Sequence, residues 1–276
     1  MESERVSIDI DGHVAHAQMV RGDRHNALDP AMFLGLRDAA ARLADEPGVR
    51  AVVLSGDGPS FCSGLDVASF GADDTTLSGD DLLGREDGQI ANLAQLVSVD
   101  WQRVPVPVIA ALHGACFGGG LQIALGADIR IAAPDVRMSV MEIKWGLVPD
   151  MGISQTLPPL VRLDVAKELT WTGRIVDGEE ALALGLVTRL ADDPLAAARE
   201  LADDIASRSP DAIRAGKQLF NECWKAGAAE GLMLESTLQR ALIGSPNQIA
   251  AIQAVMTKQP GEFVDPGAVG AGSPAR

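Results

Sequence analysis

Residues 107–121 read PVIAALHGACFGGGL, and this segment decides the fold class. Residues 106–112 form an uninterrupted apolar run, which is typical of a strand buried on both faces of a sheet. Three consecutive glycines follow and permit a sharp turn into a helix over about 120–125, whose first N–H groups are free to meet a ligand. A further apolar strand is expected at 129–132. Strand, turn, helix and strand in this order predict a largely parallel α/β sheet.

The same alternation extends in both directions along the chain. Residues 1–20 predict two short strands around the turn Asp11-Gly12. Asp29 and Pro30 are the expected N-cap and first residue of a helix that runs to about Leu43. A buried strand is predicted at 52–54. Beyond Val176 the pattern becomes helical, with helices expected at about 181–186, 194–207, 210–226, 231–242 and 246–258.

These patterns predict three parts of the chain. Residues 1–195 are expected to form the α/β core, and residues 196–260 a helical C-terminal region. The stretch 261–276 is rich in glycine, proline and alanine and is expected to be a flexible tail. Residues 67–100 interrupt the alternation and carry seven acidic residues against a single base, Arg85. We expect a solvated insertion there, part loop and part helix over 82–96.

Composition excludes several classes of function. The formal net charge of −15 argues against nucleic acid and against an anionic membrane surface, because both are bound through clustered Lys and Arg. The chain has no tyrosine, which removes every mechanism based on a catalytic phenol. Its three cysteines match no metal-binding spacing, so we expect no metal site and a reducing, cytoplasmic location. The apolar runs are too short to span a bilayer.

A second turn has the composition to cooperate with the glycine triplet. Residues 60–66, which read SFCSGLD, come shortly after the strand predicted at 52–54. Two such turns at the ends of neighbouring strands could direct two backbone N–H groups at one oxygen. That arrangement is an oxyanion hole, which stabilises the enolate formed when a thioester loses an α-proton.

Several segments, taken in order, resemble the signatures of the enoyl-CoA hydratase/isomerase (crotonase) family. They are residues 25–28 (HNAL), 61–66 (FCSGLD), 107–121, 128–132 (DIRIA) and 142–149 (EIKWGLVP). The resemblance implies a spiral of ββα repeats with a C-terminal helical trimerisation region, and trimers that often pair into hexamers. It also implies an acyl-CoA substrate in lipid metabolism such as fatty acid β-oxidation, with no cofactor besides the coenzyme A of the substrate.

The resemblance also assigns candidate binding residues. By position, the backbone N–H groups of Leu65 and Gly119 would hold the thioester oxygen. Arg24 and Lys258 are candidates for the CoA phosphates, with exposed, solvated bases as the alternative. Three further residues belong to the same predicted CoA-binding set: Ala27, Ser63 and Asp66. The acidic insertion at 67–100 would then be either a solvated surface or a wall over the acyl pocket.

The catalytic positions distinguish the reactions of this family. Hydratases carry two glutamates that activate a water, and this chain has Gln122 at the first position and Glu142 at the second. An amide has no useful proton affinity, so Gln122 is able to orient a water but not to deprotonate it. Dienoyl-CoA isomerases carry a Glu and an Asp where this chain has Glu142 and Asp150. Their further Asp at the Gln122 position is absent here.

The sequence therefore favours double-bond isomerisation, with Glu142 as the base and Asp150 as its partner. An apolar surround should raise the pKa of Glu142 by desolvation. Three alternatives stay open at this point. Asp150 could simply cap a helix. The protein could be an enoyl-CoA hydratase in which Gln122 and Glu142 share the water, or a relative that binds acyl-CoA without turnover.

Overall fold

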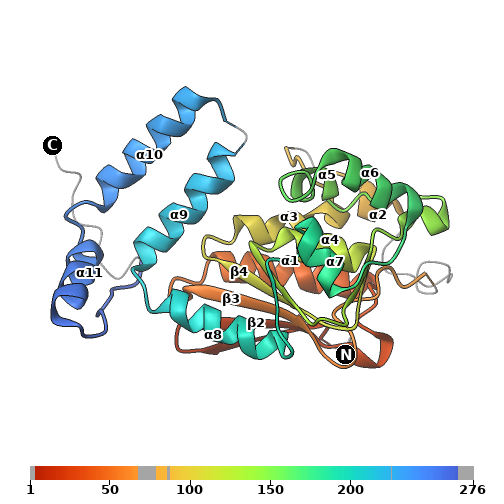
Figure 1. The fold of residues 1–276 in the computed structure, drawn as a ribbon, viewed down its shortest axis with the longest axis horizontal. Coiled ribbons are helices and arrows are strands. Elements are labelled where there is room, and N and C mark those ends of the chain that lie inside the picture. Colours follow the sequence, from red (N-terminus) through yellow and green to blue (C-terminus); the bar gives the residue numbers. More distant parts are fainter. Residues whose placement is uncertain (1–3, 68–78, 86–87, 225, 267–276) are drawn as a thin grey trace.

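A computed structural model describes residues 4–67, 79–85, 88–224 and 226–266, and it consists of an α/β body with a helical extension (Figure 1). The main sheet has the strand order β1-β2-β3-β4-β6-β8. Only β1 and β2 pair antiparallel, and every other neighbouring pair is parallel. The strands are β1 Val6–Asp11, β2 Val14–Met19, β3 Ala51–Gly56, β4 Val108–Leu112, β6 Ile129–Ala132 and β8 Arg189–Leu190. The predicted α/β class is confirmed.

A second, two-stranded parallel sheet lies after the glycine-rich segment. It pairs β5 (Ala115–Phe117) with β7 (Arg137–Ser139). The backbone of Cys116 in β5 forms an isolated parallel β-bridge with the backbone of Cys62, and both thiols are free. The small sheet therefore joins the two predicted turns. The sequence does not predict β5, because a strand of three residues is too short to give a recognisable pattern.

The central strands are apolar throughout because helices cover both faces of the sheet. Val52 and Leu54 of β3 belong to the large core, which they share with residues of α1 (Pro30–Ala44) and α3 (Leu93–Arg103). Val53, between them, faces the other way and packs with Ala198 and Ala202 of α8 (Pro194–Ala206). This double burial accounts for the unbroken apolar runs in the sequence.

Helix starts follow the predicted capping chemistry. The Asp29 side chain accepts a hydrogen bond of 2.9 Å from the Met32 N–H, and Pro30 is the first residue of α1. The other described helices are α2 Gly79–Leu83, α4 Gly119–Gly126, α5 Ile153–Thr156, α6 Leu163–Thr172, α7 Gly178–Leu184, α9 Pro210–Cys223, α10 Ala228–Leu242 and α11 Pro246–Thr257, with short 3-10 turns at Gly22–Arg24 and Glu142–Trp145. None of the helices in the described ranges is long and apolar enough to cross a membrane.

Three local expectations need correction. The helix predicted over 82–96 is instead α2 and α3, because Asn92 and Gln95 form a capping box that starts α3 at Leu93. Residues 68–78 and 86–87 of that insertion lie outside the described residues. Helix α8, which was assigned to the C-terminal region, packs on β3 and β4 and so belongs to the core.

The third correction concerns the predicted tail from residue 261. Its first residues are tied to the body, because Asn247 exchanges two hydrogen bonds with the Val264 backbone and Arg50 binds Asp265 at 2.7 Å. Residues 267–276 lie outside the described part of the chain. Beyond α8, the helices α9, α10 and α11 extend away from the sheet, at the left of Figure 1.

Candidate active site

The two predicted turns are brought together by backbone hydrogen bonds. The Cys62 N–H donates to the Ala115 oxygen at 3.0 Å, and the Phe117 N–H donates to the Cys62 oxygen at 3.0 Å. Both Cys62 and Cys116 are fully buried, and burial raises the pKa of the Cys62 thiol to about 12. A thiol in that environment stays protonated and unreactive, so both cysteines serve as small apolar fillers, as predicted.

Leu65 and Gly119 each present an unused N–H at this junction. Leu28 donates to the Gly64 oxygen and accepts from the Asp66 N–H, and this pattern leaves the N–H of the intervening Leu65 outside the bridge. Gly119 is the first residue of α4, where an N–H has no partner within the helix. Neither N–H donates to an acceptor among the described residues.

The glycines next to these N–H groups allow the two turns to approach. A Cβ on Gly64 would lie 2.9 Å from the Phe117 oxygen and 3.7 Å from the Gly119 nitrogen. Gly64 also has a φ of +92°, a conformation that L side chains rarely adopt. The close approach and the backbone angle both require glycine at position 64.

The HNAL segment supports the first turn from behind. Its Asn26 is fully buried and takes up a left-handed backbone conformation, with a φ of 52°. The Asn26 amide donates 2.8 Å hydrogen bonds to the Asp57 and Ser60 oxygens and accepts one of 2.9 Å from the Arg21 N–H. One buried side chain thus connects the segment to the loop before Cys62.

Glu142 lies directly beside the glycine triplet. A Cβ on Gly118 would be 3.4 Å from the Glu142 Oε1 atom, so this carboxylate adjoins the turn that carries the Gly119 N–H. Oε1 accepts a hydrogen bond of 2.6 Å from Gln122 Nε2. Oε2 is buried and has no hydrogen-bond partner among the described residues.

Electrostatics at Glu142 favour a base. Desolvation raises the pKa of its carboxyl group, and the neighbouring Asp150 carboxylate adds to that rise. The hydrogen bond from Gln122 opposes it by stabilising the ionised form. The raised pKa agrees with the prediction from the apolar residues around Glu142 in the sequence.

Gln122 is held at both ends of its amide. It is almost completely buried on α4, and its Oε1 atom accepts a hydrogen bond of 2.8 Å from the Met151 N–H. The structure therefore brings Gln122 and Glu142 into direct contact, as their predicted roles require. Met151 was missed by the sequence analysis, because a backbone N–H leaves no mark in the residue types.

Asp150 stands at the edge of the same site. The expectation that it might cap a helix is wrong, because α5 begins at Ile153 with Gly152 as its N-cap and no side-chain capping bond. Asp150 is an exposed residue, and partial desolvation of its carboxyl group raises its pKa. Its carboxylate is close enough to Glu142 to raise the pKa of the Glu142 carboxyl group by charge repulsion.

Two predicted CoA-binding positions, Asp66 and Ala27, contact Arg21, a residue that the sequence motifs do not mark. Arg21 binds Asp66 through an ion pair of 2.8 Å and donates a hydrogen bond of 2.8 Å to the Ala27 oxygen. The Ser63 N–H donates to the His25 oxygen of the same turn at 2.9 Å. Arg24 is exposed one turn away, with no ion pair among the described residues. Arg21 lies four residues before the HNAL segment, and a basic residue so near a predicted CoA-binding turn is the sequence signal that points to it.

Lys258 is not brought to this group. It follows α11, in a left-handed conformation with a φ of 57°, and lines a different hollow together with Arg50 and Arg208. Figure 1 places α11 at the opposite end of the molecule from α4 and α5. The predicted contact of Lys258 with CoA has no support within one chain.

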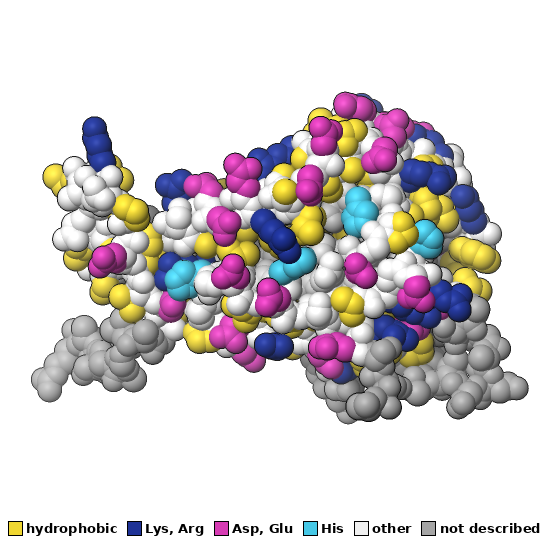
Figure 2. Space-filling view, turned by 90° about the horizontal axis from the view of Figure 1, so that it is seen from below, with side chains coloured by type: hydrophobic (Ala, Val, Ile, Leu, Met, Phe, Trp, Pro, Cys, Tyr) yellow, Lys and Arg dark blue, Asp and Glu magenta, His cyan; other side chains and the backbone are white. Residues whose placement is uncertain are grey.

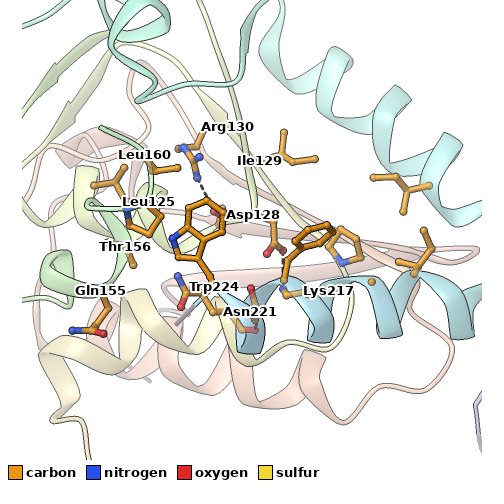
Figure 3. Close-up of a pocket in the computed structure, with 18 of the residues that line it drawn as sticks. Leu125, Asp128, Ile129, Arg130, Gln155, Thr156, Leu160, Lys217, Asn221 and Trp224 are labelled. Atoms are coloured by element: carbon orange, nitrogen blue, oxygen red, sulfur yellow. Dashed lines mark hydrogen bonds and ion pairs between the residues drawn. The ribbon is translucent and has the colours of Figure 1, made fainter. Parts of the chain in front are cut away.

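The described chain also contains a cavity of about 590 Å³ between α9 and the body (Figure 3). Leu125, Ile129 and Leu160 contribute apolar walls on the body side, and Trp224 closes it from the α9 side. At its floor Lys217 forms a buried ion pair of 2.7 Å with Asp128. None of the predicted catalytic or CoA-binding residues lines this cavity. No group of three or more His, Cys, Asp or Glu side chains suited to a metal ion occurs within the described ranges.

Comparison with known proteins agrees with this geometry. Residues 9–265 match the family described as enoyl-CoA hydratase/isomerase. The chain belongs to the enoyl-CoA hydratase/isomerase family. It is 33% identical over 254 residues to the mitochondrial Δ(3,5)-Δ(2,4)-dienoyl-CoA isomerase of Rattus norvegicus, covering 90% of this chain and 77% of that one.

Other members of the enoyl-CoA hydratase/isomerase family carry hydratase names. The mitochondrial methylglutaconyl-CoA hydratase of Mus musculus is 29% identical over 245 residues, which cover 86% of this chain and 75% of that one. The crystal structure of enoyl-CoA hydratase from Bacillus anthracis superimposes with a TM-score of 0.83 at 27% identity, covering 94% of this chain and 98% of that one. The crotonase fold and the family are thereby established, and both reactions occur among the relatives.

Proposed function

We propose that this enzyme isomerises double bonds in enoyl-CoA thioesters, and that a 3,5-dienoyl-CoA is the preferred substrate. The hydrogen bond from Gln122 to Glu142 carries the proposal, because it shows an amide where a second water-activating carboxylate would have to stand. The carboxylates that remain at the site are Glu142 and Asp150, whose pKa values are both raised. The similarity to dienoyl-CoA isomerases supports the same choice.

The proposed reaction begins with the thioester oxygen bound by the Leu65 and Gly119 N–H groups. Glu142 Oε2, which accepts no hydrogen bond from the described residues, takes a proton from C2 of the acyl chain. The electron pair spreads through the conjugated system onto the thioester oxygen, where the two N–H groups stabilise the enolate. Asp150, in its protonated form, then returns a proton at C6. Loss at C2 and gain at C6 convert the 3,5-diene into the 2,4-diene without change of mass.

The CoA portion is proposed to lie along the HNAL turn. Arg21 contacts Ala27 and Asp66 there, Ser63 bonds to the His25 oxygen of the same turn, and Arg24 is exposed. Arg24 is the base available to a phosphate, because Arg21 is already paired with Asp66. This local positive charge would act against the overall net charge of −15.

The proposal is tested with a 2-enoyl-, a 3-enoyl- and a 3,5-dienoyl-CoA of medium chain length, followed by mass and by ultraviolet absorbance. Isomerisation leaves the mass unchanged and shifts the absorbance, and we expect the largest effect with the dienoyl ester. A product heavier by one water would show hydration instead. Absence of turnover on all three esters, together with measurable binding, would identify a protein that only binds acyl-CoA.

The hydratase names among the relatives support hydration as a second candidate. In that case Gln122 and Glu142 would share one water, and Glu142 alone would deprotonate it. Replacing Gln122 by Glu would restore the paired carboxylates and should raise hydration strongly. No gain in hydration by Gln122→Glu would count against this candidate.

We further propose that the enzyme acts in the cytoplasm as a trimer or as a pair of trimers. Large apolar side chains are exposed on the C-terminal helices: Phe220, Trp224, Leu232, Met233, Val255 and Met256. Apolar side chains are visible at the left end of Figure 2, the end at which these helices lie in Figure 1. Apolar surface of this extent is typical of an interface between subunits. Sedimentation of the pure protein measures the oligomer directly, and a monomer at micromolar concentration would contradict the proposal.

A further inference from the structure

The amide of Gln122 is fixed in one orientation by its two partners. The Met151 N–H is only a donor, so the amide oxygen must face it, at 2.8 Å. The amide NH2 group must therefore face Glu142 Oε1, at 2.6 Å. The side chain is almost completely buried, so no water competes for either bond.

The backbone of Gln122 is held as firmly as its side chain. Its N–H donates to the Gly118 oxygen at 3.0 Å, and its own oxygen accepts a hydrogen bond of 2.6 Å from the Ser98 hydroxyl. Ser98 lies on α3 and Gly118 lies in the glycine triplet. Gln122 is thus hydrogen-bonded to Ser98 of α3, to the glycine triplet, to Glu142 and to Met151.

These hydrogen bonds have a direct consequence for Glu142. Oε1 accepts the hydrogen bond from the amide, and Oε2 is buried with no partner in the part of the chain that the structure describes. The other end of the amide holds Met151, the residue after Asp150. A single side chain therefore holds the Glu142 carboxylate directly and the backbone next to Asp150.

We propose that Gln122 is a positioning residue that holds Glu142 through Oε1, so that Oε2 is left for the proton transfer, and that anchors the backbone next to Asp150 through the Met151 N–H. This inference rests on the proposed isomerase function. It assigns Gln122 a role different from water activation: its NH2 group directs the Glu142 carboxylate and never exchanges a proton with the acyl chain.

Two substitutions test the two hydrogen bonds of the Gln122 amide, one to Glu142 and one from the Met151 N–H. Gln122→Met has nearly the same length and shape but makes neither hydrogen bond. Gln122→Glu keeps an acceptor for the Met151 N–H but, when ionised, places an oxygen against Glu142 Oε1. Both changes remove the donor that stabilises ionised Glu142, so both should raise the pKa of that carboxyl group above its native value.

The first readout is the ionisation of Glu142 itself, measured by a carbon-13 NMR titration of carboxyl-labelled glutamate. The resonance is assigned by its loss in Glu142→Gln. We expect Gln122→Met to move the titration midpoint to higher pH. Gln122→Glu should do the same, with the two carboxyl groups titrating together as a coupled pair.

The second readout is the pH dependence of isomerisation. The acidic limb of kcat should move to higher pH in both variants, and kcat should fall about ten- to a hundredfold while KM changes little. Gln218→Met is the matched control, because Gln218 donates to Glu222 at 3.0 Å in an exposed pair on α9. That control should leave both readouts at their native values.

The titration decides the inference without relying on turnover. An unchanged Glu142 midpoint in either folded variant would overturn the positioning role, even with a lower kcat, because a general loss of packing would lower the rate without moving the ionisation. Failure of the native enzyme on all three esters would overturn the proposed function but leave the titration result to be judged by itself.

Discussion

Gln122 Nε2 lies 2.6 Å from Glu142 Oε1, while the second oxygen of the same carboxylate is buried without a partner among the described residues. A half-satisfied buried carboxylate lowers the stability of a fold, because an ionised oxygen away from water loses its hydration. Such a group is retained where its reactivity is needed, and perturbed carboxyl groups of this kind mark functional sites. The predictions for Glu142 follow from this balance between stability and activity.

Replacing Glu142 by Gln should abolish most of the isomerase activity. The amide keeps the size and one hydrogen bond of the native side chain but does not accept a proton from carbon, so kcat should fall by about two to four orders of magnitude. Affinity for a CoA thioester should stay within about threefold, because Glu142 is not placed among the CoA contacts. Glu179→Gln, an exposed exchange in the first turn of α7, is the control for the change of charge. Full turnover by Glu142→Gln would remove Glu142 from the reaction.

The same variant should change stability in a pH-dependent way. Burial raises the pKa of Glu142, so the folded protein binds this proton more tightly than the unfolded chain does. The native enzyme therefore loses free energy of unfolding as pH rises from the ordinary glutamate range through the raised pKa, whereas the Gln variant does not. Urea unfolding at several pH values should show the difference growing in favour of Glu142→Gln and becoming constant above the raised pKa. A difference independent of pH would contradict the raised pKa.

Gly64→Ala tests the placement of the Leu65 N–H group. The native φ of +92° and a new Cβ 2.9 Å from the Phe117 oxygen both oppose alanine. The strain should lower the free energy of unfolding by about 1–3 kcal/mol and shift the turn, so kcat should fall as well. The measurements are urea unfolding and the isomerase assay.

Gly48→Ala is the matched control, because its added Cβ meets nothing within 4 Å and its φ lies outside the left-handed region. It should leave activity unchanged and stability nearly so. Equal behaviour of the two alanine variants would show that the oxyanion turn does not depend on the conformation of Gly64.

Local signals in the sequence predicted the frame of the fold. Asp29 with Pro30, and the apolar runs that form β3, β4 and β6, each carry their information within a few residues. The glycine triplet likewise marked the start of α4, because a close approach of two backbones excludes larger residues. These features depend on neighbours in sequence, and they were therefore readable from it.

Features that depend on residues distant in sequence were not readable. The Gln122 amide meets a backbone N–H at Met151, and Arg21 meets Asp66, across separations that no periodicity encodes. Asp150 before a short helix resembled a cap, yet the start of α5 at Ile153 left it unused for capping. Resemblance to a family indicates Glu142 and Asp150 as candidates, whereas only the structure shows that Gln122 bonds to Glu142 and to the backbone N–H next to Asp150.

The ion pair between Lys217 and Asp128 is predicted to hold α9 on the body. Lys217 is almost completely buried and also donates hydrogen bonds of 3.0 Å to the Trp101 and Val106 oxygens. Lys217→Met would remove the ammonium group from the Asp128 carboxylate and from both carbonyl oxygens, and would leave Asp128 with the Val108 N–H alone among its hydrogen-bond partners in the described chain, so the free energy of unfolding should fall by about 3–5 kcal/mol. Urea unfolding measures the loss, with the exposed Lys167→Met as control.

A second substitution distinguishes an unpaired charge from lost packing. Asp128→Asn in the Lys217→Met background removes the stranded charge and still offers an oxygen to the Val108 N–H, which donates to Asp128 Oδ2 at 2.7 Å in the native enzyme. The double variant should recover a substantial part of the lost stability. If Asp128→Asn instead adds its own loss to that of Lys217→Met, the two residues act independently. The ion pair would then not be what anchors α9.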